Sequence, residues 1–178
     1  MANWGNVHLV VIGSRSSVLA FSMSARRRSK YFTREMRNGE GGDLSSERAH
    51  RTAGTKTWEK HFRFQTAHDD EREHFRRLSI RHPNCWFVMS YSDPDADDVG
   101  GHLVRDGQSR SFRMSTRQRA ACYRRAGYDP NCNTEDNDVL FWEAQWMMMD
   151  ACIERARAGT RTWSTTSSSP TTGGVQRH

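Results

Sequence analysis

Arginine is the residue whose type and grouping most clearly suggest chemistry in this sequence. The chain has 178 residues and a formal net charge of +6, but the basic side chains are unevenly placed. Residues 1–38 hold seven Arg or Lys and one Glu, and residues 104–125 hold seven Arg and one Asp. Such groups favour binding to nucleic acid or to an acidic host protein. The candidate binding residues are Arg26, Arg27, Arg28, Lys30, Arg110, Arg113, Arg117, Arg119, Arg124 and Arg125.

An acidic segment offers a second interpretation of these basic zones. Residues 127–158 hold seven acids and two Arg, so the basic zones could pair with this segment within the chain or across a subunit contact. A basic face that is merely solvated would give the same pattern. The RNA-binding signature Lys/Arg-Gly-Phe-Gly-Phe is not present, so the charge pattern alone predicts an anionic partner without naming it.

The histidines are candidate metal ligands. A metal site requires two or three of them to converge with a carboxylate. His74 and His82 are eight residues apart, which places them about 80° out of alignment on a helix. His61 lies on the polar face of a predicted strand, and His68 follows that strand. The spacing therefore predicts surface histidines, no metal site and no cofactor.

Acids and cysteines complete the search for reactive groups. Asp93, Asp95, Asp97 and Asp98 lack the glycine and glutamate of a calcium loop. The four cysteines form no CxxC pair, which favours reduced thiols in a cytoplasmic protein. No G-x-S-x-G, phosphate-binding loop or dinucleotide fingerprint occurs, so we expect a non-enzymatic protein. A hydrolase or nuclease that uses the histidines and acids is the least favoured alternative.

Hydrophobic periodicity indicates the elements that would carry these groups. Strands are predicted at residues 6–12, 58–66 and 85–91, and a hairpin at residues 102–114 turns at Asp106-Gly107. Helices are predicted from about residue 15 to residue 28 or 37, and over residues 71–82. Residues 43–53 are polar and predict a loop. Strand 58–66 should have one face in water, because Glu59, His61, Arg63 and Gln65 alternate with apolar residues. The order indicates an α+β fold with helices on one face of an antiparallel sheet.

The sequence changes character after Ser115. Residues 116–126 predict a short arginine-rich helix, and a second helix runs from about residue 134 to residue 158. The second helix is apolar almost all round, so it is either a core helix or a surface for self-association. Residues 159–178 predict a disordered tail. The expected organisation is a domain at 1–115, a helical extension at 116–158 and the tail. The candidate self-association residues are Trp142, Trp146 and Met149.

Several short motifs follow one another in the order of a known family. They are Met1-Ala2-Asn3-Trp4 before the first strand, Gly54-Thr55-Lys56 and Trp58, Phe64-Gln65-Thr66-Ala67, Leu78-Ser79, and His82-Pro83. In this order, residues 1–108 resemble the YubB ferredoxin-like domain family, whose members are small phage- or plasmid-borne proteins of unknown function. The sequence departs from the family at Ala53, Thr57 and the turn His68-Asp69-Asp70.

The resemblance implies a ferredoxin-like sheet and an accessory protein of a mobile genetic element, and it supplies no catalytic residues. Together with the basic zones, it predicts binding to nucleic acid or to a host protein. The alternative is a protein-binding or structural module that forms a homo-oligomer through residues 139–153. No apolar run approaches the length of a membrane span, so no membrane partner is expected.

Overall fold

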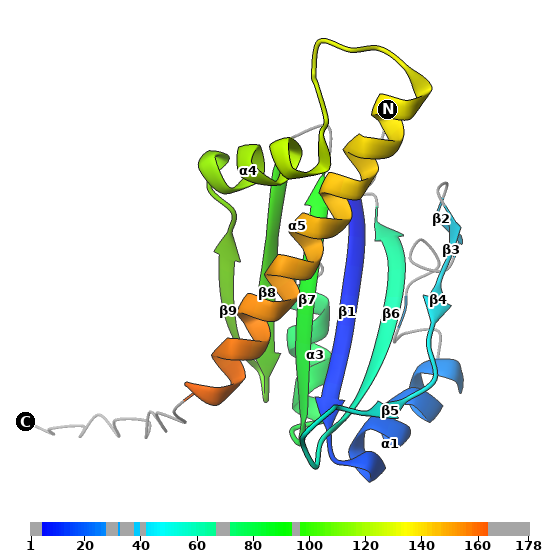
Figure 1. Ribbon diagram of the computed structural model, residues 1–178. Coiled ribbons are helices and arrows are strands. Elements are labelled where there is room, and N and C mark those ends of the chain that lie inside the picture. Colours follow the sequence, from blue (N-terminus) through cyan, green and yellow to red (C-terminus); the bar gives the residue numbers. More distant parts are fainter. Residues whose placement is uncertain are drawn as a thin grey trace, which may run out of the picture.

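The computed structural model describes residues 5–27, 32, 38–39, 42–66, 72–93 and 97–163, and its fold is α+β (Figure 1). A seven-stranded antiparallel sheet has the order β4-β6-β1-β7-β8-β9, and β5 also pairs with β6. The strands are β1 (Gly5–Gly13), β4 (Ser45–Ser46), β5 (His50–Arg51), β6 (Trp58–Thr66), β7 (Cys85–Asp93), β8 (Asp98–Arg105) and β9 (Gln108–Arg113). A separate two-stranded hairpin joins β2 (Asn38–Gly39) to β3 (Gly42–Asp43). The helices are α1 (Arg15–Arg27), α3 (Arg72–Arg81), α4 (Thr116–Ala126) and α5 (Glu135–Arg161).

Strand β1 is the centre of the sheet. It pairs with β6 on one side, with Val10 opposite His61, and with β7 on the other, with Val10 opposite Val88. Strands β6 and β7 are joined through α3 and enclose β1, an arrangement typical of ferredoxin-like sheets. The connection that contains α1 differs, because it also contains β2 to β5 and ends in β6, the immediate neighbour of β1.

Helices α1 and α3 cover one face of the sheet, which we call the helix-pair face. Its core contains six phenylalanines, which come from α1, the segment before β2, β6, α3 and β7. The predicted core positions Phe75 and Leu78 of α3 are buried here, as is Phe21 of α1. The antiparallel sheet with two helices on one face is therefore confirmed.

Helix α5 crosses the other face of the sheet, which we call the α5 face (Figure 1). Ile153 and Ala156 of α5 pack on Val10, Val88 and Leu103 of three neighbouring strands. Nearer its start, α5 also packs on α4, and Gln145 of α5 hydrogen-bonds Ser92 of β7 and the hydroxyl of Tyr123 of α4. The helix is thus part of the core along one side.

Local signals in the sequence account for the element ends. Asp106 and Gly107 have φ of 44° and 74°, which is the backbone of the predicted type I′ hairpin turn. Ser115 and Gln118 form a capping box at the start of α4, and Gly127 ends it at a φ of 81°. Thr134 caps α5 by accepting a hydrogen bond from the backbone N–H of Asn137.

Three expectations from the sequence were wrong. Residues 43–53 are not only loop, because β4 and β5 add two short segments to the edge strand β6. The predicted wet face of β6 is largely covered, since the Glu59 side chain is 7% exposed and that of His61 14%. The predicted tail does not begin at residue 159, because α5 continues to Arg161 and Trp163 packs on Trp86. Residues 164–178 lie outside the described residues.

Candidate nucleic-acid interface

A group of aromatic rings lies half-buried at the C-terminal end of α5, on the α5 face. Trp86 of β7, Phe112 of β9 and Trp163 after α5 all pack against the core cluster beneath α5. The rings of Trp86 and Trp163 meet edge to face, with centroids 5.3 Å apart. Burial on one side holds each ring in place and leaves the other side for a polar partner.

An arginine from a different element lies against each ring. The guanidinium carbon of Arg105 is 4.5 Å from the Trp86 centroid, and that of Arg110 is 4.5 Å from the Trp163 centroid. The guanidinium carbon of Arg155 is 4.7 Å from the Phe112 centroid. Stacking of this kind is attractive and fixes the plane of each guanidinium. We call the six residues the arginine–aromatic surface.

These three arginines are not neutralised by acids nearby. Within the part of the chain that the structure describes, no ion pair joins Arg105, Arg110 or Arg155 to a carboxylate. Stacking uses the face of a guanidinium and leaves N–H groups at its edge, where they can donate to a phosphate or carboxylate. In Arg105, Nε–H already donates to the backbone oxygen of Pro83 at 3.3 Å, which leaves the two terminal nitrogens. The surface therefore presents three oriented, unneutralised cations.

The structure divides the predicted basic zone of residues 104–125. Arg110 belongs to the arginine–aromatic surface. Arg113 contacts Asp98 at 3.3 Å, and Arg119 forms a bidentate pair with Asp97 at 2.9 and 3.1 Å, so these two side chains pair with acids of their own chain. The remaining predicted residues of this zone are exposed along α4: Arg117, Arg124 and Arg125.

The structure does not describe the candidate side chains of the first basic zone, but it shows how exposed the predicted self-association residues are. The side chains of Arg26 and Arg27, and all of Arg28 and Lys30, lie outside the described residues. In α5, Trp142 and Trp146 are 45% and 42% exposed, so both side chains can reach a partner, and their role in self-association stays a prediction. Met149 is 1% exposed and is one of the buried residues of α5, so its assignment to a self-association surface was wrong.

The cysteines lie where burial suppresses their reactivity. Burial raises the pKa of the Cys85 thiol to about 11 and that of Cys152 to about 12. It also raises the pKa of the Cys122 thiol. Because a thiolate is the reactive form, the raised pKa values make these three thiols poor nucleophiles.

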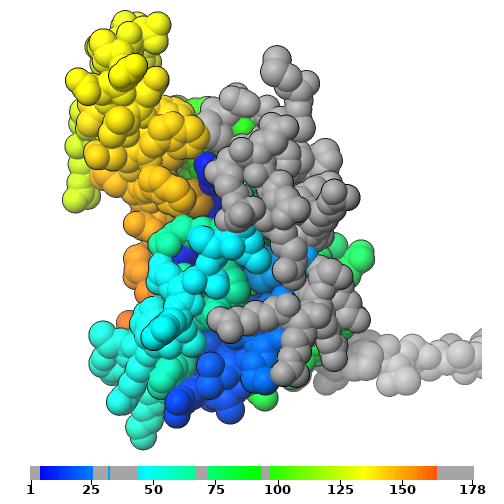
Figure 2. Space-filling model, turned by 90° about the vertical axis from the view of Figure 1, so that its right-hand side faces the viewer, coloured from blue at the N-terminus to red at the C-terminus, as the bar shows by residue number. Residues whose placement is uncertain are grey.

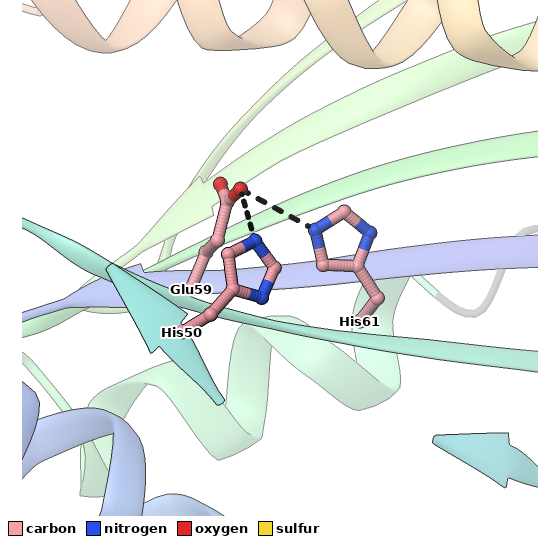
Figure 3. Close-up of side chains that lie close together, drawn as sticks. All are labelled: His50, Glu59 and His61. Atoms are coloured by element: carbon pink, nitrogen blue, oxygen red, sulfur yellow. Dashed lines mark hydrogen bonds and ion pairs between the residues drawn. The ribbon is translucent and has the colours of Figure 1, made fainter. Parts of the chain in front are cut away.

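Sequence reasoning missed two groups of residues. The first group is Arg105, Arg155 and Trp163. Arg105 was only counted in the basic zone of residues 104–125, Arg155 was taken as part of a helix end, and Trp163 was assigned to the tail. A second group, His50, Glu59 and His61, converges next to α5 with potential ligand atoms within 4.8 Å of one another (Figure 3). The alternation of β6 placed Glu59 and His61 on one face, but nothing in the sequence aligned His50 with them.

Comparison with known proteins adds no relative: no protein-family model, curated protein or solved structure matches the chain significantly. None of the described helices has the length and apolar composition that are needed to cross a membrane.

Proposed function

We propose that this chain binds the phosphate backbone of nucleic acid through the arginine–aromatic surface, as an accessory protein of a mobile genetic element. The observation that carries the proposal is that Arg105, Arg110 and Arg155 come from β8, β9 and α5, yet each is stacked on a half-buried ring at one end of one face. A guanidinium group held in a fixed plane suits bidentate recognition of a phosphate. The accessory role is supported by the resemblance of residues 1–108 alone.

The proposal concerns the backbone, so binding should show little sequence preference and a strong dependence on salt. Each neutralised phosphate on duplex DNA contributes about −0.9 to the slope of log affinity against log salt. Three arginines therefore predict a contribution of about −2.7 to that slope.

The test is fluorescence anisotropy of the full chain with labelled single-stranded and duplex DNA at several salt concentrations. Arg110→Gln and Arg155→Gln should each weaken binding and reduce the magnitude of the slope by about 0.9. The matched control is Arg81→Gln at the end of α3, which removes the same charge from the helix-pair side and should bind as the wild type does. Absence of binding at low salt, or equal losses in all three variants, would refute the proposal.

A second candidate function is self-association through α5. Val139, Trp142 and Trp146 share one side of the helix and are 57%, 45% and 42% exposed. Exposed apolar stripes of this kind mark contact surfaces. If the stripe is an interface, the full chain should sediment as a dimer, and Trp142→Glu with Trp146→Glu should give a folded monomer by analytical ultracentrifugation. A wild-type chain that remains monomeric at high concentration would exclude this function.

A further inference from the structure

We propose that His50, Glu59 and His61 form a binding site for a divalent transition-metal ion of the Zn²⁺ class. The three side chains come from two paired strands at the edge of the sheet, where His50 of β5 lies opposite Glu59 of β6. Figure 3 shows both imidazole rings turned toward one carboxylate oxygen of Glu59. Two imidazoles and one carboxylate are a common ligand set for Zn²⁺ and related ions, and they leave at least one position for water or another ligand.

The distances among the three potential ligand atoms fit a shared ion. His61 Nε2 lies 3.6 Å and His50 Nε2 lies 3.0 Å from Glu59 Oε1. Ligand atoms bound tetrahedrally to zinc at about 2.1 Å are about 3.4 Å apart, so these two distances need to change by only a few tenths of an ångström. The ligand nitrogens of the two histidines lie within 4.8 Å of each other. His61 Nε2 is buried and has no hydrogen-bond partner, which leaves it for a ligand.

In each of the three side chains, the polar atom that faces away from the proposed ion contacts a neighbouring group, as is typical of metal sites. Nδ1 of His50 lies 3.3 Å from the backbone oxygen of Arg48, and Nδ1 of His61 lies 3.0 Å from His8 Nε2. When each Nδ1–H donates along these contacts, each Nε2 presents a lone pair toward Glu59. The second carboxylate oxygen of Glu59 accepts a hydrogen bond of 2.8 Å from Arg157 Nη2 of α5.

The charges around the cluster are compatible with a cation. Arg63 pairs with Glu47, and Arg157 contacts Glu154 as well as Glu59. Arg157 is thus shared between Glu154 and Glu59, and it contacts the Glu59 oxygen that faces away from the two imidazoles, which leaves the other oxygen for the ion.

The site is accessible from solvent at His50. The side chain of His50 is 49% exposed, whereas Glu59 and His61 lie deeper. Figure 2 shows the cyan segment that contains β4 and β5 on the surface beside α5. Because β5 pairs with β6 over only two residues, a shared ion would add a strong link between this short strand and the sheet.

The test uses the full chain, stripped of metal with a chelator and titrated with Zn²⁺ by calorimetry. All proteins in the experiment carry Cys132→Ser, because this exposed thiol could bind zinc by itself. We expect one Zn²⁺ per chain, a higher melting temperature in its presence, and an absorption band with Co²⁺ that indicates four- or five-coordination. His50→Gln and His61→Gln should each lower the affinity for Zn²⁺ at least tenfold and remove the Co²⁺ band.

Two further variants separate ligands from neighbours. His8→Gln removes the imidazole behind His61 and should weaken Zn²⁺ binding by about 10- to 100-fold, as expected for a positioning residue. His74→Gln, on α3 across the sheet, is the matched control and should bind as the reference does. If His61→Gln fails to fold, His50→Gln decides, because it alters a half-exposed side chain.

The proposal is overturned if the folded reference protein binds no Zn²⁺, or if His50→Gln binds it with unchanged affinity and an unchanged Co²⁺ band. In the first case, the cluster is an ion-pair network around Glu59 and nothing more.

Discussion

The two faces of the sheet are stabilised in different ways. The helix-pair face is filled by phenylalanine rings from α1, α3, β6 and β7, which pack edge to face or tilted on one another. The α5 face combines apolar contacts beneath the helix with a strip of buried polar residues from β1, β6 and β7, some of which hydrogen-bond α5: His8, Glu59, Ser90 and Ser92. The helix-pair face also buries Lys60 and His102. Among the described residues, however, it is the α5 face that brings buried imidazole and carboxylate groups together, at His8, His61 and Glu59.

The largest expected effect is on the helix-pair face. Phe75 of α3 is fully buried and touches the rings of Phe32, Phe64 and Phe87. Phe75→Ala should lower the free energy of unfolding by about 3–5 kcal/mol, because it removes a large transfer free energy and leaves a cavity that rigid rings fill poorly. Urea denaturation followed by circular dichroism measures the loss.

The companion variant on the other face is Ile153→Ala, in the α5 cluster. It should cost about 2–5 kcal/mol and should unfold in one transition, at the same urea concentration by circular dichroism as by tryptophan fluorescence. Two separate transitions would show that α5 is an appended unit and not part of the same core. A loss below about 1 kcal/mol would lead to the same conclusion.

The sequence predicted the helix-pair face well because that face depends on local periodicity. Strand β6 has the predicted bounds Trp58–Thr66, and Phe75 and Leu78 were recognised from spacing within one helix. The apolar side chains on such elements have only one place to be buried, so pattern and structure agree. The strand β1, the Asp106-Gly107 turn and the start of α5 were predictable for similar local reasons.

The candidate sites on the α5 face could not be predicted in this way, because they depend on register and on distant contacts. His50 meets Glu59 only because β5 pairs with β6 at this position, and two residues of strand leave no periodic signal. His8 meets His61 across two strands that are 53 residues apart in sequence. Trp163 follows a helix and precedes a Ser/Thr-rich segment, so its contact with Trp86 could not be inferred from composition.

The smallest expected effect is the dependence of stability on pH, which comes from the α5 face. Burial is the main cause that lowers the pKa of His8 from 6.5 to about 3, and it also lowers that of His61. Below about pH 6.5, the unfolded chain therefore binds protons that the folded chain does not, so stability is complete above that pH and is lost as the pH falls. The slope for His8 should not exceed about 1.4 kcal/mol per pH unit.

The comparison between pH 7 and pH 5 isolates this effect, since the carboxyl groups with lowered pKa, Glu47 and Glu73, lose their contribution to stability at lower pH. Urea denaturation in the presence of a chelator should show wild-type stability falling over this interval. His8→Gln should show a smaller fall, because glutamine keeps a polar group next to His61 but takes up no proton. Phe75→Ala should lower stability equally at both pH values, since no titrating group is involved. If the free energy of unfolding falls equally in the wild type and in His8→Gln, His8 is protonated as readily in the folded chain as in the unfolded one. Water would then reach the polar strip in the folded chain.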